Sequence, residues 1–94
     1  MEEWPLPGGV ESRPYAVTVD DRDRIWVVET GAQPNRFVGF DTHSHQFLPP
    51  MAVPSGGGTI RNMVFDARNN VIWFGSDSNT IGRAQLPGAS ATVP

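Results

Sequence analysis

Hydrophobic and polar positions fall into short runs along the chain, and the runs have the length of β-strands. Residues 15–19 alternate, with Val17 and Val19 on one side. Residues 25–28 form an unbroken β-branched and aromatic run, which is typical of a strand buried on both faces. The polar residues 21–24 between them favour a tight turn. The first part of the chain therefore predicts a β-hairpin.

The hairpin pattern occurs twice. Residues 15–28 match residues 61–74, and each unit places an aspartate before its turn and a tryptophan after it. Trp26 and Trp73 hold equivalent places 47 positions apart, and both are expected to be interior packing residues. A period of about 45 residues with several short strands per unit is typical of β-propeller blades.

Further strands are expected on both sides of each hairpin. Residues 35–40 match residues 79–84 and predict a third strand in each unit. Proline-punctuated aromatic stretches stand ahead of the units, at residues 4–7 and 47–50. Because proline cannot donate to a strand ladder, these stretches suit outermost strands. Another outer strand is expected to begin at residues 85–87.

These patterns predict an all-β chain of two four-stranded antiparallel blades. Residues 1–46 hold an outer strand and the first blade, residues 47–87 the second blade, and residues 88–94 a flexible tail. The alternative is a free-standing sandwich of two sheets with eight short strands. The matching tryptophan positions favour repeated blades.

Composition excludes several classes of protein. Ten glycines and nine prolines among 94 residues disfavour a helical bundle. The absence of cysteine excludes disulfides and thiolate chemistry, and the net charge of −3 without a basic stripe argues against nucleic-acid binding. No apolar run approaches about 18 residues, so no membrane span is expected. The acidic start lacks the features of a signal peptide, so we expect a soluble protein whose compartment is unknown.

Several segments resemble the blades of the virginiamycin B lyase (streptogramin lyase) family. They are residues 12–20, 24–29 and 35–41 of the first unit, and residues 72–75 and 79–83 of the second. The family fold is a seven-bladed β-propeller, and the chain resembles its C-terminal two blades. Sugar-lactonase and NHL-type propellers share much of this pattern.

The resemblance implies a metal-assisted elimination that opens the ester of a cyclic depsipeptide antibiotic. In that chemistry a base removes a proton alpha to a carbonyl, and Mg²⁺ stabilises the developing charge. The family's functional positions match Arg13, Tyr15 and Glu29, of which only Glu29 keeps its residue type. Glu29 is therefore the candidate catalytic residue and the candidate magnesium ligand. Because the general-base histidine is missing, we expect an oligomeric binding or scaffold propeller without the family's lyase activity.

Other polar residues offer weaker candidate sites. Arg13, Tyr15, Arg61 and Asn62 are expected at the mouth of a central channel, where they would bind a small polar or peptide ligand. The alternative function is a metal-assisted C–O lyase, or a lactonase-like enzyme, formed in the assembled ring.

The two histidines form a further candidate. His43 and His45, with Asp41, have the residue types of a metal site, but they are better interpreted as exposed residues of a turn. Asp20 and Asp66 are expected to cap the two hairpin turns.

Two blades alone would leave two apolar faces uncovered. Repeat proteins generally need about three units or capping elements to be stable. We therefore expect a closed homo-oligomer, in which a homotrimer gives six blades and a homotetramer gives eight. In such a ring, residues 4–7 would close the last blade of a neighbouring copy as its outermost strand.

Overall fold

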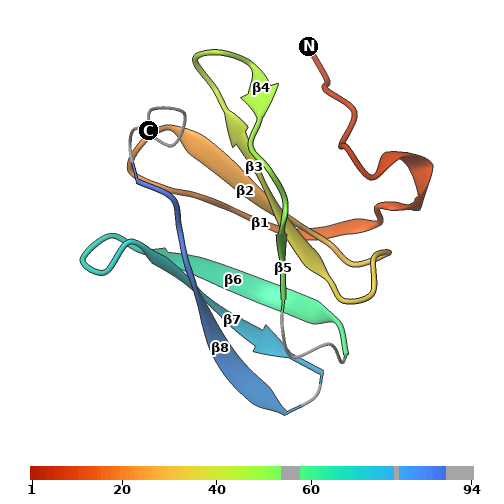
Figure 1. Cartoon of the computed structure of the whole chain (residues 1–94), viewed down its shortest axis with the longest axis vertical. Coiled ribbons are helices and arrows are strands. Elements are labelled where there is room, and N and C mark those ends of the chain that lie inside the picture. The colour runs from red at the N-terminus through yellow and green to blue at the C-terminus, as the bar shows by residue number, and fades with distance from the viewer. Residues whose placement is uncertain (54–57, 78, 89–94) are drawn as a thin grey trace.

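The computed structural model describes residues 1–53, 58–77 and 79–88, and this part of the chain is all-β, as predicted (Figure 1). The first sheet is antiparallel and contains five strands. They are β1 (Pro14–Val19), β2 (Arg24–Glu29), β3 (Arg36–Asp41), β4 (Gln46–Phe47) and β5 (Met51–Ala52).

The second sheet is antiparallel as well and has three strands in the order β6-β7-β8, so the described residues form sheets of five and three strands and not the predicted four in each. They are β6 (Ile60–Asp66), β7 (Val71–Ser76) and β8 (Thr80–Gln85). The hairpins and the third strand of each unit therefore occur where the alternation and the repeat predict them. Of the predicted tail, only Gly88 belongs to the described residues.

The outer strand of the first sheet is interrupted. β4 and β5 both pair with β3, on either side of Pro49 and Pro50, which cannot donate to the ladder. Leu48 N donates to Gly39 O at 2.8 Å and continues the pairing toward the prolines. The predicted division at residues 46 and 47 thus runs through this outer strand, which is hydrogen-bonded to the first sheet.

The outer strand expected at residues 4–7 does not form within the chain, and that prediction is wrong for the isolated molecule. The segment instead packs Trp4 against the side of the first sheet, with its ring centroid 5.2 Å from that of Phe40. A single turn of 3-10 helix, η1 (Gly9–Glu11), then leads into β1. Residues 86 and 87 are not in a strand either, and Gln85 is the last residue of β8.

The two sheets stack on one another and share one core. The buried side chains come from both sheets and from the segments beside them: Trp26, Val28, Phe37, Val53, Ile60, Ile72, Phe74 and Leu86. The sheets approach most closely where β1 lies beside β6. On the opposite side a cavity of about 270 Å³ separates β5 from β8. The stack is therefore a wedge that opens toward the outer strands (Figure 1).

Each sheet also has a face turned away from the core. Because side chains alternate along a strand, the residues between the core positions form these outer faces. The outer face of the first sheet is formed by Val17, Val19, Ile25, Val27, Val38 and Phe40. The outer face of the second sheet is formed by Asn62, Val64, Trp73, Gly75, Ile81 and Arg83.

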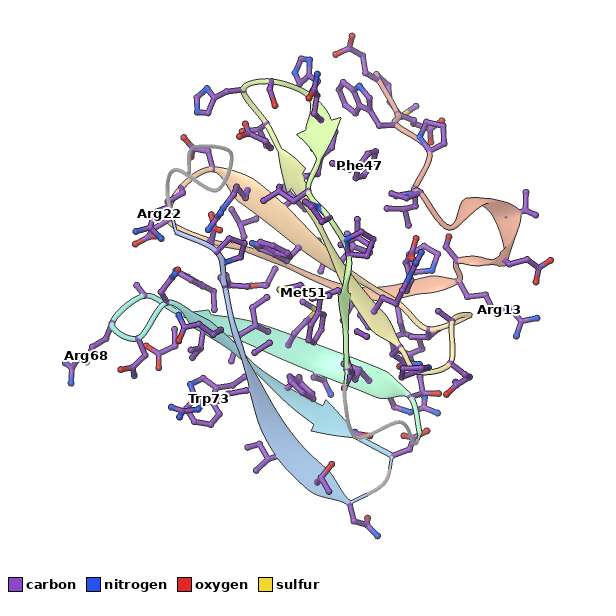
Figure 2. The ribbon with its side chains drawn as sticks, in the orientation of Figure 1. Arg13, Arg22, Phe47, Met51, Arg68 and Trp73 are labelled. Atoms are coloured by element: carbon purple, nitrogen blue, oxygen red, sulfur yellow. The ribbon has the colours of Figure 1, made fainter. Side chains whose placement is uncertain are left out.

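The equivalent tryptophans of the two units lie in different environments. Trp26 is fully buried between the sheets, whereas Trp73 is half-buried on the outer face of the second sheet (Figure 2). The expectation that both are interior residues is confirmed for Trp26 and is wrong for Trp73. The physical reason is that, in the part of the chain that the structure describes, no further sheet packs on the outer face of the second sheet.

Candidate functional site

The structure brings two of the predicted channel-mouth residues together at the edge where the sheets meet. Tyr15 and Arg61 lie at equivalent places near the starts of β1 and β6. Arg61 Nη1 donates to the Tyr15 hydroxyl at 3.2 Å, and the guanidinium carbon lies 5.5 Å from the centroid of the Tyr15 ring. Asp77, from the turn after β7, completes the group through Arg61 Nε at 2.7 Å. We call Tyr15, Arg61 and Asp77 the rim cluster.

The rim cluster is exposed and carries paired charges. The hydrogen bond from Arg61 lowers the pKa of Asp77 below 3.8, and the same carboxylate raises the pKa of Arg61. A guanidinium has five N–H groups, more than its contacts to Asp77 and Tyr15 use. The cluster is therefore suited to hydrogen-bonding a polar or anionic group. Arg61 keeps its positive charge at any physiological pH.

The other two channel-mouth residues stand apart from this cluster. Arg13 is exposed, has a positive φ of 46°, and accepts hydrogen bonds at its carbonyl from the backbone and hydroxyl of Thr30. Asn62 is exposed on the outer face of the second sheet, where it lines a hollow with Trp73 and Ile81. Among the described residues, no hydrogen bond or ion pair joins either side chain to Tyr15 or Arg61, so the predicted four-residue mouth is only partly assembled within one copy.

Glu29 is buried and its two carboxylate oxygens are both engaged. Oε1 accepts from Arg36 Nε at 2.9 Å and from Arg36 Nη2 at 2.5 Å. Oε2 accepts from the backbone N–H of Gly8 at 2.9 Å. The carboxylate therefore ties the N-terminal segment and β3 to the end of β2, and its side chain has no exposed surface.

These contacts do not fit Glu29 to the magnesium role that the family resemblance implies. A magnesium ion is bound through carboxylate oxygens and keeps several waters, which requires an accessible oxygen. The Arg36 guanidinium already supplies the positive charge beside Oε1. Within residues 1–53, 58–77 and 79–88, moreover, no group of three or more His, Cys, Asp or Glu side chains is arranged to hold a metal ion. We therefore derive no chemical step through magnesium.

The two histidines lie in the turn between β3 and β4, as expected. Asp41 Oδ1 accepts from the backbone N–H groups of His43 and Ser44 and so caps this turn. His43 Nε2 lies 2.9 Å from Asp23 Oδ2, whereas the ring of His45 stacks on Phe40. The two rings contact different partners, as expected for residues of a turn and not for ligands of one metal ion.

We expect His43 to titrate above its ordinary pKa of 6.5, because its hydrogen bond to Asp23 favours the protonated ring. This pair stabilises the fold below the pKa of the unfolded chain, and the contribution is lost as the pH rises through the folded value. An NMR titration of the ring protons should therefore show the raised midpoint. In Asp23→Asn the midpoint should fall toward 6.5, and an unchanged midpoint would contradict this account.

Sequence inspection missed one buried polar cluster, formed by Asp20, Arg24 and Trp26. Asp20 caps its turn as predicted, through bonds from the Arg22 and Arg24 amides. Its second oxygen also accepts from Arg24 Nε at 2.6 Å and from the Trp26 indole at 2.9 Å. The sequence signal for this cluster is the aspartate and the tryptophan that recur in both units. In the second unit Asp66 likewise accepts from the Trp73 indole at 3.0 Å.

Comparison of the chain with models of protein families, with curated proteins and with solved structures found no match. The resemblance to streptogramin lyases therefore rests on the blade residues alone. None of the helical segments in the described part of the chain has the length and apolarity needed to cross a membrane.

Proposed function

We propose that the chain is a self-assembling β-propeller-like module, related in blade pattern to virginiamycin B lyases, that serves as a scaffold and binding ring. The observation that carries the proposal is the way in which the two sheets stack. Ile72 and Phe74 enter the core from the second sheet, and their equivalents Ile25 and Val27 lie on the outer face of the first. Conversely, buried Trp26 has its equivalent on the outer face of the second sheet.

The stacking is therefore head-to-tail. It leaves the outer face of the second sheet uncovered by the described residues, and the outer face of the first sheet is covered in part by the segment that carries Trp4 and Leu6. The outer face of the second sheet corresponds to the face that the first sheet buries in the core. The outer face of the first sheet corresponds to the face that the second sheet buries. A second copy can repeat the observed contact by placing the outer face of its own first sheet on the outer face of the first copy's second sheet. Such a heterologous contact closes into a ring when the rotation fits.

Exposed apolar side chains on both outer faces support this association. Val17 and Val19 are 61% and 56% exposed on the first sheet, and Val64 and Ile81 are 59% and 78% exposed on the second. Contiguous exposed apolar surface of this kind marks interaction sites in soluble proteins. The two sheets form a wedge whose narrow edge is made by β1 and β6. This shape favours a ring over a flat stack, because repeated wedges curve toward their narrow edge.

The ring would consist of three or four copies, with six or eight sheets around one channel. Because β1 and β6 form the narrow edge of the wedge, their side chains would face this channel. Each copy would then contribute one rim cluster, and the channel mouth would carry three or four Arg61–Tyr15 pairs. This repeated polar rim is suited to a small polar or peptide ligand. The buried, fully bonded state of Glu29 supports a scaffold over a lyase.

We expect Ile81→Glu to weaken self-association at least tenfold, because it places a charge in the proposed contact between apolar faces. Light scattering over a series of protein concentrations measures the effect. The matched control is Val10→Glu, since Val10 is 98% exposed in η1 and belongs to neither outer face. A wild-type chain that stays at 10.3 kDa at all concentrations would exclude the proposal.

A further inference from the structure

The outer face of the first sheet is open on one side and covered on the other. Beside β1, Val17 and Val19 are more than half exposed. Val38 and Phe40 lie on the same face toward the other edge of the sheet, and both are buried. The difference is due to the N-terminal segment, residues 1–7, which packs on this half of the face. We call residues 1–7 the N-terminal cover.

Side chains hold the cover in place. The centroid of the Trp4 indole lies 5.2 Å from that of the Phe40 ring and 5.0 Å from that of the His45 ring. Trp4 and Leu6 line one hollow together with residues of β2, β3 and β4: Ile25, Val27, Val38, Phe40 and Phe47. Among the described residues, no backbone hydrogen bond joins the cover to these strands. The cover can therefore leave the sheet without breaking a strand ladder.

The cover occupies the surface that a neighbouring copy would need in the proposed ring. Ile72 and Phe74 of the second sheet are buried in the core between the sheets. Their equivalents on the first sheet, Ile25 and Val27, lie under the cover. A head-to-tail contact between copies would bury Ile25 and Val27 in the same way, against the outer face of a second sheet. The cover and the neighbouring copy therefore compete for one surface.

Resting on the proposed assembly, we infer that the N-terminal cover is autoinhibitory: while it is docked, a second copy cannot pack on the first sheet. The apparent dissociation constant for association is then the intrinsic constant divided by the fraction of chains whose cover is released. Docking of the cover is intramolecular, so it does not depend on protein concentration, whereas packing of a second copy does. The covered form therefore prevails in dilute protein, and assembly begins only when the concentration rises.

The movement is confined to the cover by the anchor that follows it. Gly8 N donates to Glu29 Oε2 at 2.9 Å, and the Glu29 carboxylate is itself held by Arg36. Pro5 and Pro7 each fix φ at about −65°, so the cover has fewer conformations to lose when it docks. Release therefore changes the course of the cover and leaves the strands of the first sheet in place.

Weakening the cover should strengthen association. Trp4→Ala is expected to lower the apparent dissociation constant about tenfold, because the buried part of the indole favours the docked form. Light scattering over a series of protein concentrations measures the change, and circular dichroism checks the fold. The double variant with Ile81→Glu, which places a charge on the other face of the proposed contact, should lose this gain.

A milder variant acts on the cover from the β3–β4 turn. His45→Asn removes the ring that packs on the indole and leaves the strands of both outer faces unchanged. Asparagine tolerates the positive φ of 58° at this position. The expected gain in association is about two- to tenfold, the range that one aromatic contact contributes. His43→Asn is the matched control and should associate as wild type does, because His43 contacts Asp23 in the same turn.

The outcomes separate this inference from the proposed assembly. A gain in Trp4→Ala that Ile81→Glu cancels would support the cover, because the copies then meet through the proposed pair of faces. A gain that persists beside Ile81→Glu would overturn it, since the uncovered surface would be associating without regard to that face. Unchanged or weaker association in Trp4→Ala would overturn the cover and leave the assembly standing. If neither wild type nor the variants associate, both are excluded. Should Trp4→Ala fail to fold, His45→Asn decides between the same outcomes.

Discussion

Replacing Asp20 with asparagine is expected to destabilise the fold by about 3–5 kcal/mol, the range for breaking a buried ion pair by removing one partner. Asp20 and Arg24 are 5% and 3% exposed. The change leaves the Arg24 guanidinium buried without its counter-charge. It also removes an acceptor for the Trp26 indole, because an asparagine amide has only one oxygen. For a small domain this loss is a large part of the total stability.

Asp66→Asn is the matched control, because Asp66 holds the equivalent place in the second unit. Its Oδ2 accepts from the Trp73 indole at 3.0 Å and from Asn69 Nδ2 at 2.8 Å, and both are neutral donors. We expect the substitution to cost clearly less stability than Asp20→Asn, because no buried charge loses its partner. Urea unfolding followed by circular dichroism measures both variants. Equal losses in the two would show that the buried charge pair is not decisive.

The pH dependence of stability provides an independent check on the same carboxylate. Burial alone would raise the pKa of Asp20, but the hydrogen bonds from Trp26, Arg22 and Arg24 outweigh it and lower the pKa below 3.8. A lowered folded pKa means that the contribution is present above the unfolded value. It is lost as the pH falls through the folded value. Wild type should therefore lose more stability on acidification than Asp20→Asn.

The strands of both sheets could be predicted from sequence because their signals are local. The alternation that puts Val17 and Val19 on one face specifies the first strand, and the apolar run at residues 25–28 specifies the next one. Both signals come from residues within the strand itself. The N-terminal strand could not be predicted in the same way. Residues 4–7 have the composition of an edge strand, but pairing also requires a free edge within reach. In the isolated chain Trp4 packs on Phe40 instead.

The candidate site was predictable only where the repeat determined it. Tyr15 and Arg61 were expected at one rim because they hold equivalent positions, and the structure brings them into contact. The environment of Glu29 depends instead on residues that are remote from it in the repeat pattern. Arg36 lies across the ladder, and Gly8 belongs to a segment whose course the pattern did not predict. The carboxylate of Glu29, at the end of β2, is therefore buried and joins two other segments through hydrogen bonds.

The equivalent tryptophans provide the sharpest test of the assembly, since the same substitution should have different consequences at the two places. Trp26→Ala is expected to lower the free energy of unfolding by about 3–5 kcal/mol, because the ring is fully buried. The ring also packs closely against Gly39, where even one added carbon would lie 2.7 Å from it. If this variant does not fold, Trp26→Phe is the milder change, because it keeps an aromatic ring in the core while losing the bond to Asp20 and part of the buried volume.

Trp73→Ala should instead act on association. The Trp73 ring lies on the outer face of the second sheet, with the Arg83 guanidinium carbon 5.9 Å from its centroid, so its loss opens no cavity between the sheets. We expect a loss of about 1 kcal/mol in the isolated chain, because the indole no longer donates to Asp66. We also expect at least a tenfold weaker association, as for an aromatic residue central to an interface. Urea unfolding at low concentration and light scattering at high concentration separate the two effects. Unchanged association in Trp73→Ala would mean that this face is not where copies meet, because a neighbouring first sheet would have to cover Trp73 just as the second sheet covers Trp26.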